Sequence, residues 1–280
     1  MAMNPHTAER PGTSPAGPLS AEPLSFEPQW AAAALESADL HAGMPLRTEE
    51  RARADGYQAG TPRRDFVAGR ILARVLAADL VNGVLQAGKD LDKDKNQKPE
   101  AGMAQVLPED LELTQYCGRC AANSHGSTRI RLPGTGWEPV VSYARSGGWL
   151  LLGLAPRGHL LGMDLVDLGD QAFTGHAGHQ LEDYAFAPEE REILGRLPEP
   201  ERRLARARLW ALKEAVAKAS GEGLAGEGGI PVVAGAKTHR MLRLKGTRVT
   251  ELPPGSRDMR GNLLPENLLG TMLWSTREPS

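Results

Sequence analysis

Residues 210–224, W-A-L-K-E-A-V-A-K-A-S-G-E-G-L, are the stretch around which the rest of the chain is organised. At about 100° per residue they form an amphipathic helix with Glu214 and Lys218 together on its charged side. Gly221 is expected to end the helix, because glycine adopts a left-handed backbone without a Cβ penalty. The opposite, apolar face is formed by Leu209, Leu212, Val216 and Ala219.

Glutamate followed four residues later by lysine is also a common pair on helix surfaces, where it contributes a few tenths of a kcal/mol. The longer pattern here is W-x-x-K-E-A-x-x-K followed by G-x-G-L, and it has an acidic strand upstream, G-M-D-L-V-D at residues 162–167. Alternation along that strand directs Asp164 and Val166 to one face and Leu165 and Asp167 to the other. Asp164 is therefore the strand carboxylate expected to face the helix.

Together, the two motifs resemble the signature of the 4′-phosphopantetheinyl transferases, which move the phosphopantetheine arm of coenzyme A onto a serine of a carrier protein. The similarity runs from Arg63 to Leu224 and is closest to the larger, two-lobed surfactin-synthetase-activating type with actinobacterial-like features. It implies an α+β fold of two pseudo-symmetric lobes with the active site in the cleft between them.

The resemblance also implies roles for the charged residues. Asp164 and Glu214 would hold Mg²⁺, which takes carboxylate oxygens together with phosphate oxygens of the substrate. Lys213 and Lys218 would neutralise charge on the pyrophosphate of coenzyme A, while the carrier serine attacks the β-phosphate and 3′,5′-ADP leaves. Glu214, or a water beside the metal, would take the serine proton, so Glu214 and Lys218 are the expected catalytic residues.

A second helix is predicted after Pro62, in the run R-R-D-F-V-A-G-R-I-L-A-R-V-L-A-A-D-L-V. Its apolar face is formed by Ala68, Leu72, Val75, Leu76 and Leu80, and the opposite face by Arg63, Arg70 and Arg74. Such an arginine stripe is either a solvated face or an anion site. The resemblance implies that Arg63, Arg64 and Arg70 bind the 3′-phosphate and adenine end of coenzyme A, since a guanidinium group binds phosphate bidentately.

Strands are predicted over residues 140–143, 149–154 and 160–166, the last two joined by the hairpin-like turn A-P-R-G-H. The family's S-H-S element corresponds to residues 142–146, S-Y-A-R-S, so Arg145 stands where a histidine would contact a phosphate of coenzyme A. Its alternative is an ordinary turn arginine.

Two further positions depart from the family pattern. The usual G-K-P turn is replaced by G-S-T-R at residues 126–129, with Arg129 as a substitute cation, and Val166 stands where many larger transferases have a second strand carboxylate.

The segment C-G-R-C-A-A-N-S-H-G contains Cys117, Cys120 and His125. A structural zinc site normally has four ligands, and no second C-x-x-C or H-x3-H motif completes one here. A redox pair is an alternative. The same C-x-x-C…H-G arrangement resembles one found in actinobacterial members of the transferase family.

Four arginines (Arg202, Arg203, Arg206 and Arg208) precede Trp210. They either form a basic rim that meets an acidic carrier protein or a solvated helix face. After Leu224, short strands are predicted at M-L-R-L-K and R-V-T-E-L.

The 280 residues divide into a disordered tail at 1–28, an N-terminal lobe at 29–159 and a C-terminal lobe at 160–280 that carries the metal site. The Ala-rich region from Trp30 to Tyr57 is expected to be helical. Residues 86–109 are polar without periodicity, which predicts a surface loop inserted into the first lobe.

With 33 basic and 35 acidic residues, the formal net charge is −2, which argues against a nucleic-acid partner. No apolar run approaches the ~20 residues of a membrane span, and the first residues lack the apolar core of a signal peptide. We therefore expect a cytoplasmic protein that works without nucleic acid or membrane. A monomer is also expected.

The resemblance implies a Mg²⁺-dependent transferase that uses coenzyme A to activate an apo acyl or peptidyl carrier protein, in fatty acid, polyketide or nonribosomal peptide biosynthesis. A non-catalytic homologue that binds coenzyme A and carrier proteins is the alternative. A C-x-x-C metal or redox protein is a third possibility.

Overall fold

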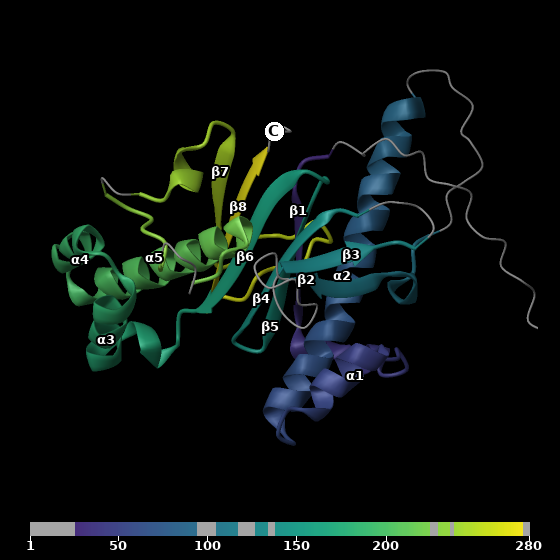
Figure 1. Cartoon of the computed structure of the whole chain (residues 1–280), viewed down its shortest axis with the longest axis horizontal. Coiled ribbons are helices and arrows are strands. Elements are labelled where there is room, and N and C mark those ends of the chain that lie inside the picture. Colours follow the sequence, from purple (N-terminus) through teal and green to yellow (C-terminus); the bar gives the residue numbers. More distant parts are fainter. Residues whose placement is uncertain are drawn as a thin grey trace, which may run out of the picture.

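The computed structural model describes residues 26–93, 105–116, 127–133, 138–224, 229–235 and 238–276. These residues form helices and antiparallel sheets, so the predicted α+β class is confirmed. Figure 1 shows the strands in the middle of the molecule and helices at both sides. On one side lie α1 (Thr48–Asp55) and α2 (Thr61–Lys93), and on the other α3 (Gly175–Ala185), α4 (Pro188–Gly195) and α5 (Glu199–Ser220).

Five strands of the described chain form the first sheet, in the order β1-β5-β4-β3-β2. They are β1 (Gln29–Ala34), β2 (Glu112–Tyr116), β3 (Ser127–Arg131), β4 (Val140–Ser146) and β5 (Trp149–Ala155). Gly147 and Gly148 join β4 to β5 with φ angles of 54° and 75°, the left-handed backbone that a two-residue hairpin turn requires. Arg145 pairs with Leu150, so it lies in strand β4 and is not a turn arginine.

Helix α2 covers one face of this sheet. Leu72, Leu76 and Leu80 are completely or almost completely buried, which confirms the predicted apolar face. They share one core cluster with sheet residues that point to the same side: Val141, Leu150, Leu152 and Leu154. The alternate residues Ala144 and Leu151 point to the other side of the sheet.

The second sheet, as far as the chain is described, has the order β6-β8-β7. Its strands are β6 (His159–Asp167), β7 (Thr247–Leu252) and β8 (Leu268–Thr276). The central strand β8 was not predicted, although its sequence is strongly apolar. Both of its faces are covered, with Met272 and Trp274 packed toward the first sheet and Leu269 and Leu273 toward α5. A strand buried on both sides carries no polar alternation that would reveal it.

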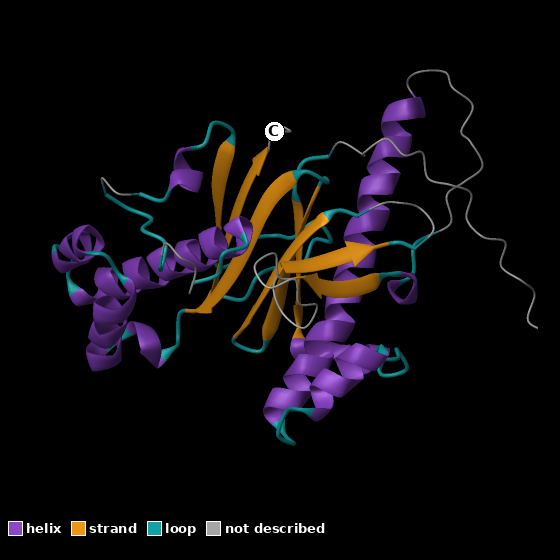
Figure 2. Ribbon diagram, viewed as in Figure 1, coloured by secondary structure: helices purple, strands orange, loops and turns teal. Residues whose placement is uncertain are grey.

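The two sheets pack face to face, and α5 covers the outer face of the second sheet (Figure 2). Met163 and Leu165 of β6 share a core cluster with Ala144 and Leu151 of the first sheet. β6 also lies alongside β4, where the Met163 backbone N–H donates a 2.9 Å hydrogen bond to Ser142 Oγ. The order of layers is therefore α2, first sheet, second sheet, α5, with β4 and β6 adjacent where the sheets meet.

The Ala-rich region is the main error in the predicted elements. Residues 31–34 belong to strand β1, which pairs with β5 along its whole length, and only the 3₁₀ turn η1 (Leu35–His41) and α1 follow as helical structure. Alanine prefers helices, but here its small side chain fits between α2 and the second sheet, and Ala31 and Ala32 are buried on opposite faces. Tertiary packing overrides propensity.

Other boundaries also shift. Helix α2 continues to Lys93, so the first part of the segment predicted as a loop over 86–109 is helical, and the 3₁₀ turn η2 (Pro108–Asp110) lies at its other end. Residues 94–104 are outside the described residues. The turn A-P-R-G-H leads from the first sheet into the second and does not close a hairpin. M-L-R-L-K contains the 3₁₀ turn η4 (Arg240–Arg243) in place of a strand.

The predicted tail, residues 1–28, falls almost entirely outside the described residues, because the description begins at residue 26. The division into lobes at 29–159 and 160–280, and their pseudo-symmetry, stay predictions. Across the described ranges, no helix combines the length and the apolar character needed to cross a membrane.

Candidate active site

The contact between β6 and α5 is unusually close at Gly162. A Cβ at this position would lie 1.8 Å from the carbonyl oxygen of Ala215, so any other residue would push the helix away from the strand. Asp164 and Val166 follow Gly162 at intervals of two and point to the same side. The glycine of the G-x-D motif therefore brings the strand carboxylate up to the helix.

Asp164, Lys218 and Glu214 come together between β6 and α5. Lys218 Nζ donates to Asp164 Oδ1 at 2.7 Å and to the carbonyl oxygen of Met163 at 3.0 Å. Asp164 is only 6% exposed, whereas Glu214 and Lys218 are half-buried. Burial raises the pKa of Asp164 to about 6, Lys218 opposes this shift, and the negative charge of Glu214 adds to it. Glu214 is thus close enough to Asp164 for the two carboxylates to repel each other.

The other two residues of the acidic strand have different surroundings. Val166 belongs to an apolar cluster with Phe173, Ala207 and Ala211, where it faces α5 as predicted. Asp167 accepts hydrogen bonds from the Gly169 backbone N–H at 2.7 Å and from Asn267 Nδ2 at 3.0 Å. It closes a turn at the end of the strand and does not join the cluster of Asp164.

Lys213 does not reach this cluster. Its ammonium group is completely buried on another side of α5 and donates to Glu190 Oε2 at 2.6 Å and to the carbonyl oxygen of Pro231 at 2.7 Å. Burial lowers the pKa of Lys213, while Glu190 opposes the shift. Glu190 also accepts hydrogen bonds from the backbone of Ala187 and Val233. Lys213 therefore joins α5 to α4 and to the segment after α5, and we do not retain it as a phosphate ligand.

The arginines of α2 divide into exposed and buried pairs. Arg63 is exposed and forms an ion pair with Asp55 at 2.9 Å, and Arg64 lies 3.5 Å from Asp65. Neither is among the residues that line the pocket described below.

Arg70 and Arg74 are 5% and 2% exposed, so the expectation of a solvated arginine face is wrong for them. Both bind the buried carboxylate of Glu50 on α1. Helix α1 packs against α2 on the side that carries these two arginines. Two guanidinium groups thus share one carboxylate, and Arg74 Nε has no partner among the described atoms. Burial lowers the pKa of Arg74, although arginine stays protonated in proteins.

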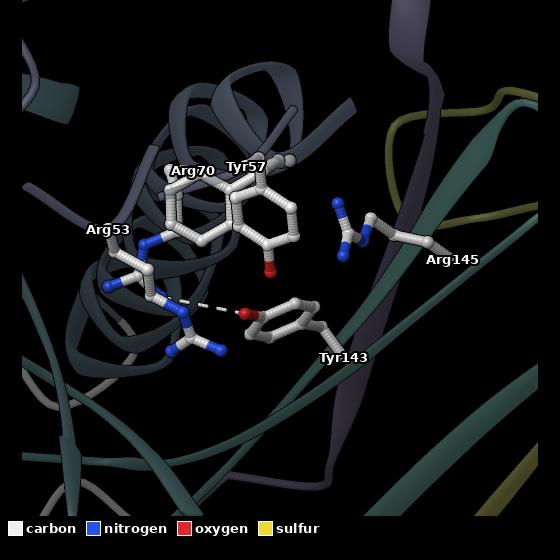
Figure 3. A pocket seen from close by; sticks show the side chains of 7 residues that line it. Arg53, Tyr57, Arg70, Tyr143 and Arg145 are labelled. Carbon is white, nitrogen blue, oxygen red and sulfur yellow. Dashed lines mark hydrogen bonds between the residues drawn. The ribbon is translucent and has the colours of Figure 1, made fainter. Parts of the chain in front are cut away.

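A small pocket that is open to solvent lies between α1, α2 and β4. Figure 3 shows the rings of Tyr57 and Tyr143 lying between Arg145 on one side and Arg53 and Arg70 on the other. Arg70 donates to the Tyr143 hydroxyl at 3.5 Å. The remaining walls are Phe66, whose ring stacks on Tyr57 at 5.2 Å, and Gly69.

The structure thus brings Arg70 and Arg145 together, as predicted, and adds Arg53, Tyr57 and Tyr143, which were not predicted. Glu50, Arg53 and Tyr57 follow one another at intervals of three and four residues, the spacing of one helix face. That spacing was a usable signal, but its partner Tyr143 is distant in the sequence and only the fold brings it close.

Two predicted features lie elsewhere. Cys117, Cys120, His125 and Gly126 are outside the described residues. Arg129, the proposed substitute in the altered turn, lies over the ring of Tyr116, 4.7 Å from its centroid.

The arginines of the basic run before Trp210 all bind other groups of the protein. Arg202 and Arg206 bind Glu182, Arg203 donates to the carbonyl oxygen of Leu168, and Arg208 pairs with Glu251. Arg206 is completely buried. These interactions weaken the prediction of a free basic rim for a carrier protein.

These features define an α+β protein in which a lysine and two carboxylates meet between a strand and a helix, beside a sheet that bears an arginine-lined pocket. Comparison with protein families matches residues 160–245 to the 4′-phosphopantetheinyl transferase superfamily. The matched part of the chain contains Asp164, Glu214 and Lys218 and is similar to that superfamily, as its motifs predicted. A search of curated proteins finds no match. Transfer of a phosphopantetheine group is the general activity that the family match supports.

Proposed function

We propose that this protein transfers the 4′-phosphopantetheine group of coenzyme A to a serine of an apo acyl or peptidyl carrier protein. The observation that carries the proposal is the cluster of Asp164, Glu214 and Lys218. A buried carboxylate with a second carboxylate nearby is costly unless positive charge compensates it. Within the described ranges, Lys218 is the cation that contacts Asp164, and the pair of carboxylates favours a site for a further cation and a phosphate-bearing substrate.

The donor set fits Mg²⁺. Asp164 and Glu214 are the two carboxylates of the cluster. Across the described ranges no group of three or more metal-binding side chains occurs. Mg²⁺ is often bound by one or two carboxylates together with substrate phosphates and water. Val166 adds no ligand, since its surroundings are apolar. Bound there, Mg²⁺ would supply charge neutralisation for the pyrophosphate of coenzyme A.

The arginine pocket is a suitable site for the 3′-phosphate and adenine end. Arg70 and Arg74 together carry one more charge than Glu50 neutralises, and a phosphate group would balance the excess. Tyr57 and Tyr143 supply aromatic rings beside the arginines. The Ser142–Met163 hydrogen bond places Tyr143 and Asp164 one residue beyond a direct contact between β4 and β6. The proposal requires coenzyme A to run along this junction, from Tyr143 on β4 to Asp164 on β6.

The chain's own residues account for the transfer step as follows. Lys218 leaves its contact with Asp164 and neutralises the developing charge of the leaving group. Glu214 accepts the proton of the carrier serine, whose oxygen forms a bond to the β-phosphorus. The bond from that phosphorus to the bridging oxygen breaks, and 3′,5′-ADP leaves with the electron pair. Positioning and charge stabilisation are the main contributions expected of such a site.

The test measures the mass gain of a purified apo carrier protein in the presence of coenzyme A and Mg²⁺. Asp164→Ala and Glu214→Ala are each expected to lower transfer by about 100-fold or more, as for the loss of a preorganised charged group. Asp167→Ala is the matched control, because this acid lies on the same strand but only closes a turn. Full activity in both cluster variants would contradict the assignment. A panel of acyl and peptidyl carrier domains would then identify the partner.

A non-catalytic homologue that binds coenzyme A and carrier proteins is the second candidate, and the apolar surroundings of Val166 favour it. Calorimetry with coenzyme A and Mg²⁺, followed by the same mass assay, separates the two functions. Binding without transfer supports the non-catalytic protein. A cytoplasmic location and a monomeric state are part of the proposal and can be examined by fractionation and by light scattering.

A further inference from the structure

Arg145 and Gly69 form a contact between β4 and α2 at the edge of the arginine pocket. A Cβ on Gly69 would lie 3.0 Å from Arg145 Cδ and 3.2 Å from its Nη1, and the three atoms nearest to that position all belong to Arg145. The Arg145 side chain therefore lies flat across α2 in the space that the missing side chain leaves. It ends in a 2.6 Å hydrogen bond from Nη1 to the carbonyl oxygen of Asp65.

Glycine is otherwise unfavourable at this position. Gly69 lies inside the long helix α2, where glycine costs about 1 kcal/mol relative to alanine. Its φ is not in the left-handed region that would explain a glycine by backbone conformation. The close contact with Arg145 is thus the structural reason for a glycine at residue 69.

We propose that Gly69 is a positioning residue that fixes the guanidinium group of Arg145 at the pocket, and that the pair sets the preference for a 3′-phosphorylated nucleotide. The inference rests on the proposed binding of coenzyme A. With Gly69, the Arg145 side chain is held between the helix surface and the Asp65 carbonyl, and part of its donor fork stays directed at the pocket shown in Figure 3. A larger residue at 69 displaces it and removes that orientation.

The experiment compares 3′,5′-ADP with 5′-AMP by calorimetry, because the two differ only in the 3′-phosphate. The ratio of their dissociation constants measures what that phosphate contributes. Gly69→Leu is expected to reduce the ratio about tenfold, the effect of losing one charge-assisted hydrogen bond, and Gly69→Ala about threefold. Arg145→Ala should match Gly69→Leu, and the double variant Gly69→Leu/Arg145→Ala should show no further loss.

Gly83→Ala is the matched control. It makes the same change in the same helix, but its Cβ meets Met259 and not Arg145. The ratio should be unchanged in this variant. Gly69→Ala should also raise the midpoint of thermal unfolding by about 2 °C through helix propensity, so weaker binding cannot be attributed to loss of structure.

Two outcomes overturn the inference in distinguishable ways. If the wild-type protein transfers phosphopantetheine and the ratio of the two dissociation constants is the same in wild type and Gly69→Leu, Gly69 does not position Arg145 for binding. A wild-type protein that binds both nucleotides equally contradicts the 3′-phosphate preference itself, whether or not it transfers the group.

Discussion

At the scale of single residues, Asp164 is the most informative. It is a nearly buried acid whose pKa is raised to about 6, with one lysine as partner and a second carboxylate nearby. A position chosen for stability alone would hold a neutral or apolar residue there. Acids with strongly perturbed pKa values cluster at functional sites, where their chemistry outweighs the loss of stability.

The raised pKa gives a stability prediction with a definite sign. The folded-state pKa of about 6 exceeds the ordinary value near 4, so the folded protein binds this proton more tightly than the unfolded chain does. The protonated carboxyl therefore contributes stability at low pH, and this contribution is lost as the pH rises through about 6. Asp164→Asn should therefore raise the free energy of unfolding at pH 8, by on the order of 1–2 kcal/mol. The difference from wild type should vanish near pH 4, as measured by urea unfolding.

Asp167→Asn is the control for this measurement. The Asp167 carboxylate accepts two hydrogen bonds at the surface, and its replacement should give no gain in stability at pH 8. A wild-type protein as stable as Asp164→Asn at pH 8 would show that the carboxylate is not strained in the folded state.

At the scale of elements, α5 is held by two different lysines. Lys218 faces the candidate site, and Lys213 faces Glu190 at the start of α4. The spacing of five residues along a helix separates them by roughly 140° around the axis, which explains why one motif supplies both a site and a structural contact. Glu190 in turn binds the backbone at Ala187 and Val233, so the pair connects three segments.

Lys213→Met should lower the free energy of unfolding by about 3–5 kcal/mol, because it leaves the buried Glu190 carboxylate without its countercharge. The double variant Glu190→Gln/Lys213→Met should recover part of that loss. In preparations that stay folded, the KM for coenzyme A should be unchanged. Lys218→Met is the contrast for transfer, which should fall greatly, although it also costs some stability because it removes the countercharge of the nearly buried Asp164. A raised KM in Lys213→Met would restore Lys213 as a phosphate ligand.

At the scale of the whole molecule, the two sheets share one interior. Met163 of β6 is fully buried between them, and its side chain lies against the Gly153 backbone of the first sheet. The loop before β8 adds a second connection, since Asp258 accepts from the Ala32 backbone N–H and Arg260 pairs with Asp79 of α2. We therefore expect the described part of the chain to unfold as one unit.

Met163→Ala tests this expectation. It should lower the free energy of unfolding by about 2–5 kcal/mol, the usual range for a buried methionine. Tryptophan fluorescence and far-ultraviolet circular dichroism should shift together in one urea transition. Exposed Met259→Ala, in the loop before β8, should have a much smaller effect. Two separated transitions would instead indicate lobes that fold independently.

Some elements could be predicted from the sequence because they depend only on residues close together in the chain. Helix α5, its end at Gly221 with φ of 73°, and the alternation on β6 follow from spacing and backbone chemistry alone. The placement of Asp164 opposite Glu214 and Lys218 came from family resemblance, and the structure has the same arrangement. Residues 160–245, the segment matched to the family, contain all three.

Only the tertiary structure decided the rest. It turned the Ala-rich region into strand β1, made β8 the centre of a sheet, and buried Arg70, Arg74 and Lys213 against Glu50 and Glu190. It also joined Tyr57 and Tyr143 in one pocket. The physical reason is the same in each case. Strand pairing and the pairing of buried charges depend on partners far away in the chain, and neither periodicity nor residue type shows which partner a residue will meet.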